Sequence, residues 1–119
     1  MKPKVHIARV YDPIELPVGH RVLVDRLWPR GIAKSSAPFD EWVKEIAPST
    51  ELRKWYGHTP ERFEEFASRY RNELSDGPQR IALDDLRVRA RKNALVLMTA
   101  TKDIDRSGAV VLRDLILTT

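Results

Sequence analysis

Apolar residues recur along this chain in two spacings, and each spacing predicts a different kind of element. Short apolar runs predict strands at Val5–Val10, Arg21–Leu27 and Ala94–Ala100. The second and third runs are continuously apolar at their centres, which is typical of strands covered on both faces of a sheet. Elsewhere, apolar residues spaced three and four apart predict amphipathic helices.

Capping residues mark the ends of these helical segments. Helices are predicted over Phe39–Ile46, from the N-cap Ser49 to Gly57, from the N-cap Thr59 to Leu74, over Ile81–Lys92, and over about Ser107–Leu117. Pro60 suits the first helical position, and Asp76-Gly77-Pro78 separates two helices. Pro13 and Pro17 disfavour helix and frame a loop that runs up to Gly19.

The order of the elements predicts the fold class. A long helical crossover separates the second strand from the third, which favours parallel pairing of these strands. Helices on both faces of a mostly parallel sheet make a small three-layer α/β sandwich. The 119 residues contain no repeat and suit a single domain, 1–119, with one hydrophobic core.

Composition excludes several classes of function. The chain has no cysteine, which rules out disulfides, thiolate zinc sites and a cysteine nucleophile. No apolar run approaches the roughly 20 residues of a membrane helix, and Met1–Lys4 lacks the apolar stretch of a signal peptide. We therefore expect a cytoplasmic protein with no membrane partner.

The net charge of +4, from 21 basic and 17 acidic residues, permits a nucleic-acid partner without requiring one. The strongest basic cluster is Arg87–Lys92. Its preferred interpretation is a solvated helix end that suits the helix dipole, and a nucleic-acid contact is the weaker alternative.

Charged and aromatic residues follow each predicted strand. They are Arg9, Tyr11 and Asp12 after the first strand, Asp25, Arg26, Trp28 and Arg30 after the second, and Thr101, Lys102 and Asp103 after the third. In an open parallel sheet, ligands bind at the carboxyl ends of the strands. We therefore expect these residues to gather on one rim.

The rim residues suit an anion. Arg26 and Arg30 carry planar guanidinium groups that grip phosphate or carboxylate with paired hydrogen bonds. Trp28 adds a stacking surface, and Gly31 permits close approach of the backbone. The candidate ligand-binding residues are Arg26, Trp28, Arg30, Arg53, Lys102 and Asp103. The alternative is structural: Asp25 pairs with Arg26 or Lys102, and Trp28 fills the core, which is the favoured interpretation for Trp28.

Signals of catalysis are weaker. His58, in a loop between two helices, and Asp25 are candidate general bases, with a capping or solvated role as the alternative for His58. The three histidines show no metal-ligand spacing, so no metal is expected. Neither GxGxxG nor a P-loop occurs, so no nucleotide cofactor is expected. Ser49 lacks the glycines of a nucleophile elbow and suits a cap.

These residues together resemble the YeaO-like proteins of the DUF488 family. The resemblance rests on Arg9–Pro13, Val22–Gly31, Ala47-Pro48-Ser49, Leu52–Trp55, His58, Arg69-Tyr70 and Glu73-Leu74, and it covers nearly the whole chain. It implies a small single-domain α/β protein without an assigned function. Residues that recur in the family are Asp25, Arg26, Trp28, Arg30, Trp42, Lys44, Ser49, Arg53, Trp55, His58, Lys102 and Asp103. Family members often carry asparagines before the last helix, where this chain has Asp105–Ala109.

Three functional hypotheses follow. The first is a binding module for a phosphate- or carboxylate-bearing small molecule at the rim. The second is an enzyme that acts on such an anion, with His58 or Asp25 as the base. The third is a structural or nucleic-acid-interacting protein, in which the arginines and tryptophans hold the fold together.

Overall fold

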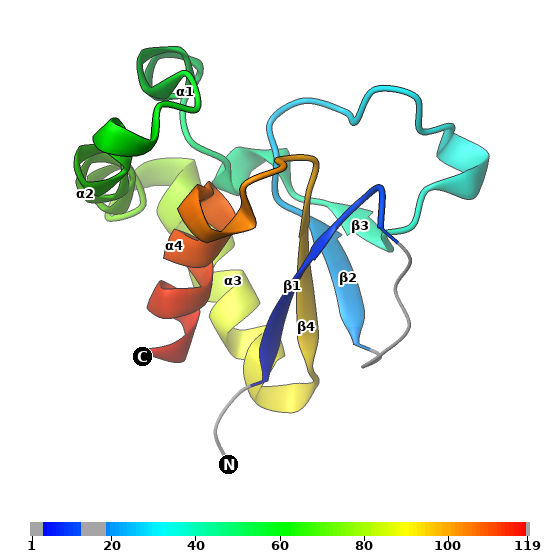
Figure 1. Ribbon diagram of the computed structural model, residues 1–119. Helices are drawn as coiled ribbons and strands as arrows, with labels where there is room; N and C mark the ends of the chain where they lie inside the picture. Colours follow the sequence, from blue (N-terminus) through cyan, green and yellow to red (C-terminus); the bar gives the residue numbers. More distant parts are fainter. Residues whose placement is uncertain (1–3, 13–18, 119) are drawn as a thin grey trace.

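The computed structural model, which describes residues 4–12 and 19–118, contains one parallel sheet with the strand order β1-β4-β2-β3 (Figure 1). The strands are β1 (Val5–Arg9), β2 (His20–Leu23), β3 (Glu41–Trp42) and β4 (Leu95–Thr99). The α-helices are α1 (Thr50–Tyr56), α2 (Phe63–Glu73), α3 (Gly77–Lys92) and α4 (Gly108–Leu117). The short 3-10 helices are η1 (Lys34–Ser36), η2 (Lys44–Ile46), η3 (Pro60–Arg62) and η4 (Ile104–Arg106).

The central strand β4 is buried along its whole length and divides the core in two. Leu95 and Leu97 face one apolar cluster, whereas Val96 and Met98 face the other, because successive side chains of a strand point to opposite faces. The neighbouring β2 divides in the same way. Burial on both faces is what its continuous apolar run predicted.

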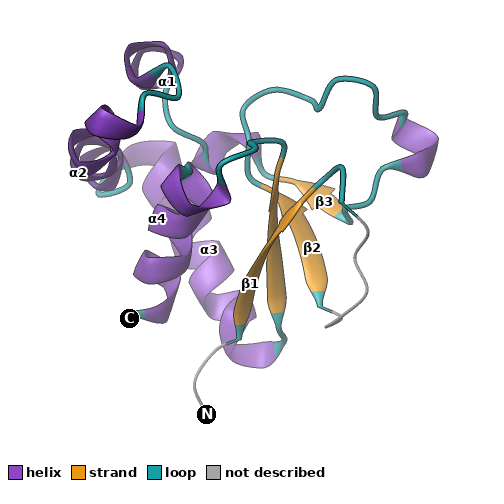
Figure 2. Cartoon of the chain, in the orientation of Figure 1, coloured by secondary structure: helices purple, strands orange, loops and turns teal. Residues whose placement is uncertain are grey.

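Different parts of the chain pack on the two faces of the sheet. All four α-helices place buried side chains in the cluster that contains Leu95 and Leu97. The opposite cluster is completed by Phe39 and Trp42, which come from the long segment after β2 that also carries η1 (Figure 2). The predicted small α/β fold with a parallel sheet is confirmed. The α-helices predicted on both faces instead pack on one face, and this segment covers the other.

The predicted helix over Phe39–Ile46 is wrong. The short strand β3 lies there, and only η2 at the end of the segment is helical. Trp42 packs in one core cluster and Val43 against the other, as consecutive residues of an extended strand do. The Trp42 ring lies 5.5 Å from that of Trp28 on the sheet face opposite the α-helices, so tertiary packing overrides the helical spacing.

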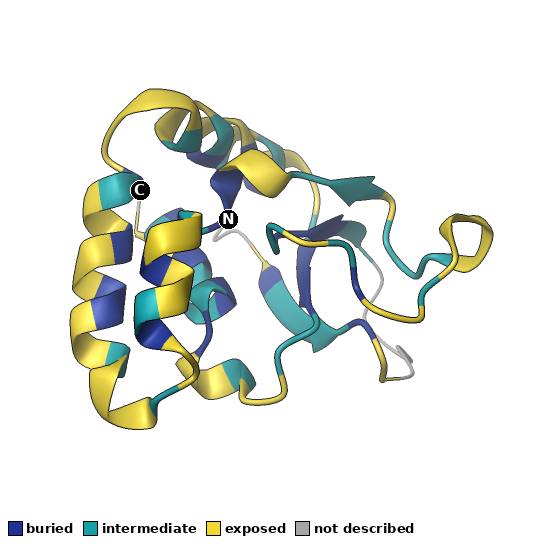
Figure 3. Ribbon diagram, turned by 90° about the horizontal axis from the view of Figure 1, so that it is seen from above, coloured by how far each residue is buried: buried dark blue, intermediate teal, exposed yellow. Residues whose placement is uncertain are grey.

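The other predicted helices are present, with some shifted ends. Ser49 caps α1 by accepting a hydrogen bond from a backbone N–H of its first turn, and Gly57 ends α1 in the left-handed conformation. Pro60 begins η3, which precedes α2, and the Thr59 hydroxyl makes no capping hydrogen bond. The helix α3 already begins at Gly77. Figure 3 shows that the outward faces of the helices are exposed while their inward faces are buried.

The strand β2 ends at Leu23 and not at Leu27. The predicted loop from Pro13 falls outside the described residues up to position 18. In the described part of the chain, no helix is long and apolar enough to cross a membrane.

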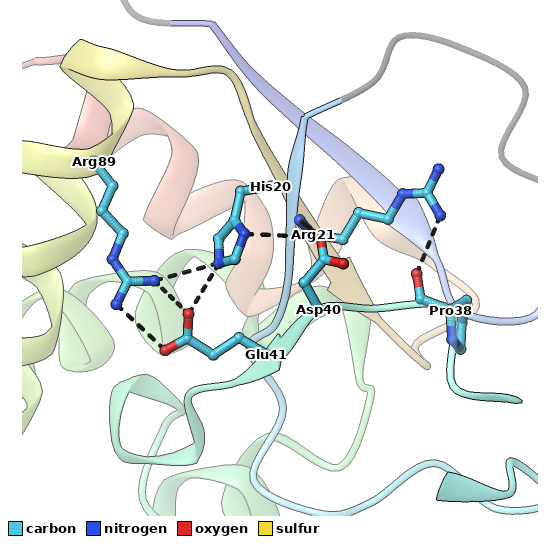
Figure 4. Close-up of polar contacts among 6 residues, drawn as sticks. All are labelled: His20, Arg21, Pro38, Asp40, Glu41 and Arg89. Carbon is cyan, nitrogen blue, oxygen red and sulfur yellow. Dashed lines mark hydrogen bonds and ion pairs between the residues drawn. The ribbon is translucent and has the colours of Figure 1, made fainter. Parts of the chain in front are cut away.

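A polar cluster fastens the segment after β2 to the first half of that strand (Figure 4). Glu41 of β3 forms an ion pair with Arg89 of α3, and its Oε1 lies 3.0 Å from Nε2 of His20. Arg89 also pairs with Asp85 at 3.0 Å. The hydrogen bonds with Arg89 and then with His20 hold the pKa of Glu41 below its usual value.

We predict that Glu41→Gln destabilises the protein at neutral pH and has less effect in acid. Because the pKa of Glu41 is lowered by folding, its ionised form contributes stability above the unfolded pKa, and this contribution is lost as the pH falls through the folded pKa. The expected loss at pH 7 is about 0.2–1 kcal/mol in urea unfolding. Glu45→Gln, at an exposed position, is the control, and a loss that stays constant into acid would contradict the prediction.

Candidate functional site

A cavity of about 360 Å³ lies at the carboxyl ends of the strands. Its walls come from the segments after β1, β2 and β4, from α1 and the turn behind it, and from the start of α4. The lining residues include Tyr11, Asp25, Arg26, Trp28, Arg30, Arg53, His58, Thr99, Thr101, Arg106 and Gly108. Residues from distant parts of the chain therefore meet at the edge of the sheet where a parallel fold binds ligands.

Asp25 joins the ends of two neighbouring strands. Its carboxylate accepts a hydrogen bond from the Thr99 hydroxyl and another from the Ala100 backbone N–H, both at 2.8 Å. Desolvation raises the pKa of Asp25, although these two hydrogen bonds and the charge of His58 act to lower it. Asp25 makes none of the described ion pairs, so the structural alternative of pairing with Arg26 or Lys102 is wrong.

The half-buried side chain of Arg26 binds two backbone carbonyls. Its Nε donates to the Pro48 carbonyl and its Nη2 to the Ala47 carbonyl, each at 3.0 Å. These bonds tie the end of β2 to the segment that leads into α1. Arg26 therefore helps to set the position of Arg53, which α1 carries into the lining of the same cavity.

Trp28 both lines the cavity and packs within the protein. Its indole N–H donates to the Ile32 carbonyl at 2.6 Å, and its ring meets Phe39 and Trp42 edge-on, with centroids 5.2 and 5.5 Å away. The indole of Trp42 in turn donates to the Asp25 carbonyl at 2.7 Å. The predicted packing role of Trp28 is thus present, and its indole N–H already has a partner.

Three of the predicted cations have exposed side chains. Arg30 and Arg53 line the cavity, whereas Lys102 lies just beyond Thr101 and outside the lining. None of the three takes part in an ion pair or a side-chain hydrogen bond within residues 4–12 and 19–118. Their positive charge is therefore not neutralised within these residues and is available to a ligand.

Asp103 and His58 have different surroundings. Asp103 lies outside the cavity lining and pairs with Arg106 at 3.0 Å. His58 is exposed, has a positive φ of 56°, and lines the cavity together with Asp25. The fold thus brings together the two residues that sequence reasoning proposed as bases.

Comparison with known proteins identifies the family. A family model described as the inactive DUF488-N3 subclade matches residues 4–119. The chain belongs to the DUF488 family. The uncharacterised proteins Mb3100c of Mycobacterium bovis and Rv3073c of Mycobacterium tuberculosis are each 49% identical over 113 residues, which cover 95% of this chain and 93% of each relative. The uncharacterised protein YeaO of Escherichia coli is 43% identical over 111 residues, covering 92% of this chain and 94% of YeaO. No solved structure matches.

Sequence reasoning missed several residues of the cavity in this DUF488 protein. Arg106 lines it, although nothing in the sequence distinguished this arginine from a surface residue. Tyr56 also lines the cavity and donates from its hydroxyl to the Arg106 carbonyl at 2.7 Å. Gly108 and Ala109, at the start of α4, also line the cavity together with Ser107. The Ser107 hydroxyl donates to the Ile104 carbonyl and does not cap the helix.

Other residues singled out in the sequence have structural surroundings. Ser49 donates from its hydroxyl to Glu73 at 2.6 Å while it caps α1. The Lys44 ammonium lies 5.3 Å from the centre of the Trp42 ring. In the described part of this DUF488 protein, no group of three or more histidine and carboxylate side chains is arranged to hold a metal ion.

We predict that Thr99→Val destabilises the protein by about 1.5–3 kcal/mol, the usual contribution of a hydrogen bond to a charged group. Thr99 is only 2% exposed, and valine matches its shape without the donor that Asp25 requires. Chemical denaturation at pH 7 measures the loss. Thr59→Val, which removes a hydroxyl without a capping bond, is the control and should change stability by less than about 0.5 kcal/mol. Equal effects of the two substitutions would contradict the role given to Asp25.

We predict that Asp25→Asn changes how the free energy of unfolding depends on pH. Because folding raises the pKa of Asp25, this carboxyl takes up a proton more readily in the folded protein than in the unfolded chain. This contribution to stability is complete below the unfolded pKa and is lost as the pH rises through the folded pKa. The free energy of unfolding of the wild type, minus that of the variant, should therefore decrease as the pH rises from about 4. A difference that stays constant or increases would show that the pKa is not raised.

Proposed function

We propose that the cavity binds an anionic small molecule that carries a phosphate or carboxylate group. The observation that carries the proposal is an excess of guanidinium charge: Arg26, Arg30 and Arg53 line one cavity, and no described carboxylate pairs with them. The acidic side chain in the lining, Asp25, is already engaged by Thr99 and Ala100.

Electrostatics favour an anion at this position. Cations that share a cavity repel one another, and a bound anion relieves that repulsion while it accepts hydrogen bonds from planar guanidinium groups. Arg26 retains unused donors beyond the two that hold Ala47 and Pro48. A phosphate group, with up to two negative charges, suits the excess better than a single carboxylate.

Two observations support a small molecule over a nucleic-acid backbone. The basic cluster on α3 is partly engaged within the protein, because Arg87 donates to the Leu115 carbonyl and Arg89 pairs with Glu41 and Asp85. Arg26, Arg30 and Arg53, which have no carboxylate partner among the described residues, instead line a concave site. Its volume of about 360 Å³ is in the range of small-molecule pockets.

Binding without turnover is favoured over an enzyme. Asp25 and His58 do share the cavity, as a catalytic role requires. However, both carboxylate oxygens of Asp25 accept internal hydrogen bonds, and the matching family model is described as an inactive subclade. We therefore assign Asp25 to the support of the site.

The proposal predicts that the protein binds inorganic pyrophosphate or citrate and that Arg53→Gln weakens this binding about tenfold or more. A hydrogen bond to a charged group contributes about 1.5–3 kcal/mol, and each 1.4 kcal/mol corresponds to a tenfold change in affinity. Isothermal titration calorimetry measures the affinity, which should also decrease as salt is added. The two probes separate phosphate recognition from carboxylate recognition.

Arg71→Gln is the matched control, because Arg71 is exposed on α2 and lies outside the cavity lining. It should leave the affinity unchanged. The proposal is wrong if the wild type binds neither probe, or if both substitutions weaken binding equally.

A further inference from the structure

A single long-range hydrogen bond crosses the rim of the cavity. The hydroxyl of Tyr11 donates to the backbone carbonyl of Arg30 at 2.7 Å. Tyr11 follows β1 and Arg30 follows β2, and the strand order places β4 between these two strands. The bond therefore spans the carboxyl end of the central strand, and both residues line the cavity.

Arg30 lies in a turn that is closed by hydrogen bonds between its own residues. The Trp28 indole donates to the Ile32 carbonyl at 2.6 Å, and the Ile32 amide approaches the Pro29 carbonyl at 3.4 Å. In the described part of the chain, the Tyr11 hydroxyl makes the only hydrogen bond that reaches residues 29–31 from outside this turn. Among residues 4–12 and 19–118, the Arg30 side chain has no hydrogen-bond or ion-pair partner that would hold it at the rim.

Tyr11, which is 42% exposed, contacts β1 through Arg9. The guanidinium of Arg9, in β1, lies 5.1 Å from the centre of the Tyr11 ring and forms an ion pair with Asp12 at 3.6 Å. The strand β1 pairs with β4 along its whole length. The phenol therefore connects a fixed strand to an exposed turn.

We propose that Tyr11 is a positioning residue of the anion site: its hydroxyl holds the turn so that the Arg30 guanidinium stays beside the cavity. This inference rests on the function proposed above. Tyr11 does not need to touch the anion, because its effect passes through the Arg30 backbone. A purely structural role of Tyr11 would instead be independent of the Arg30 side chain.

A double-mutant cycle with inorganic pyrophosphate tests this dependence. Tyr11→Phe should weaken binding about two- to tenfold, as expected for the loss of one hydrogen bond of about 0.5–1.5 kcal/mol. In an Arg30→Gln background, the same substitution should have no further effect, because the side chain that Tyr11 positions is then absent. Independent, additive losses, or no loss in Tyr11→Phe, would overturn the inference.

Amide hydrogen exchange of the ligand-free protein gives a second readout. Tyr11→Phe should accelerate exchange at the Ile32 amide, whereas Arg30→Gln, which keeps the accepting carbonyl, should not. Unchanged exchange in Tyr11→Phe would overturn the inference even when pyrophosphate binds. Failure of the wild type to bind pyrophosphate would overturn the inferred role of Tyr11. If citrate still binds, the proposed function stands for a carboxylate ligand; if neither probe binds, that function is also wrong.

Discussion

The half-buried carboxylate of Asp25 is the constraint on which the cavity depends. A carboxylate withdrawn from water must find donors, and Asp25 finds them in the hydroxyl of Thr99 and the N–H of Ala100. These bonds fasten the end of β2 to the end of β4, and β2 ends just before Asp25. The chain then turns away, which carries Arg26 toward α1 and Trp28 toward the sheet face opposite the α-helices.

The arginines near this turn divide into two kinds. Arg26 is bound to the carbonyls of Ala47 and Pro48, so it is part of the scaffold as well as the cavity lining. Arg30 and Arg53 have no such partners among the described residues, and their charge is available to a ligand. The sequence allowed two interpretations of these arginines, binding a ligand or binding groups of the protein itself. These interpretations apply to different arginines. The shape of the site depends on Arg26, and its proposed affinity depends on the other two.

The binding role proposed here, without turnover, is consistent with the family comparison. The matching model is described as an inactive subclade. In this chain, Asp25, the acidic side chain in the lining, is engaged by Thr99 and Ala100 at the carboxyl end of β4, and the surrounding charge is mainly positive. Such an arrangement stabilises a bound anion without requiring a free base beside it. The role proposed for Tyr11 fits this arrangement, because Tyr11 restrains the turn of Arg30 while the Arg30 guanidinium contacts the anion.

Local patterns in the sequence predicted the strands β1, β2 and β4, the caps of α1 at Ser49 and Gly57, and the gathering of charged residues at the strand ends. These features depend on neighbouring residues or on the direction of parallel strands. Only the tertiary structure decided that Trp42 belongs to a strand, because its ring packs against Trp28 on the face opposite the α-helices. It also decided which arginine is bound internally, since the carbonyls that Arg26 reaches lie more than 20 residues away along the chain. Side-chain partners of this kind are set by folding in three dimensions, and no local spacing encodes them.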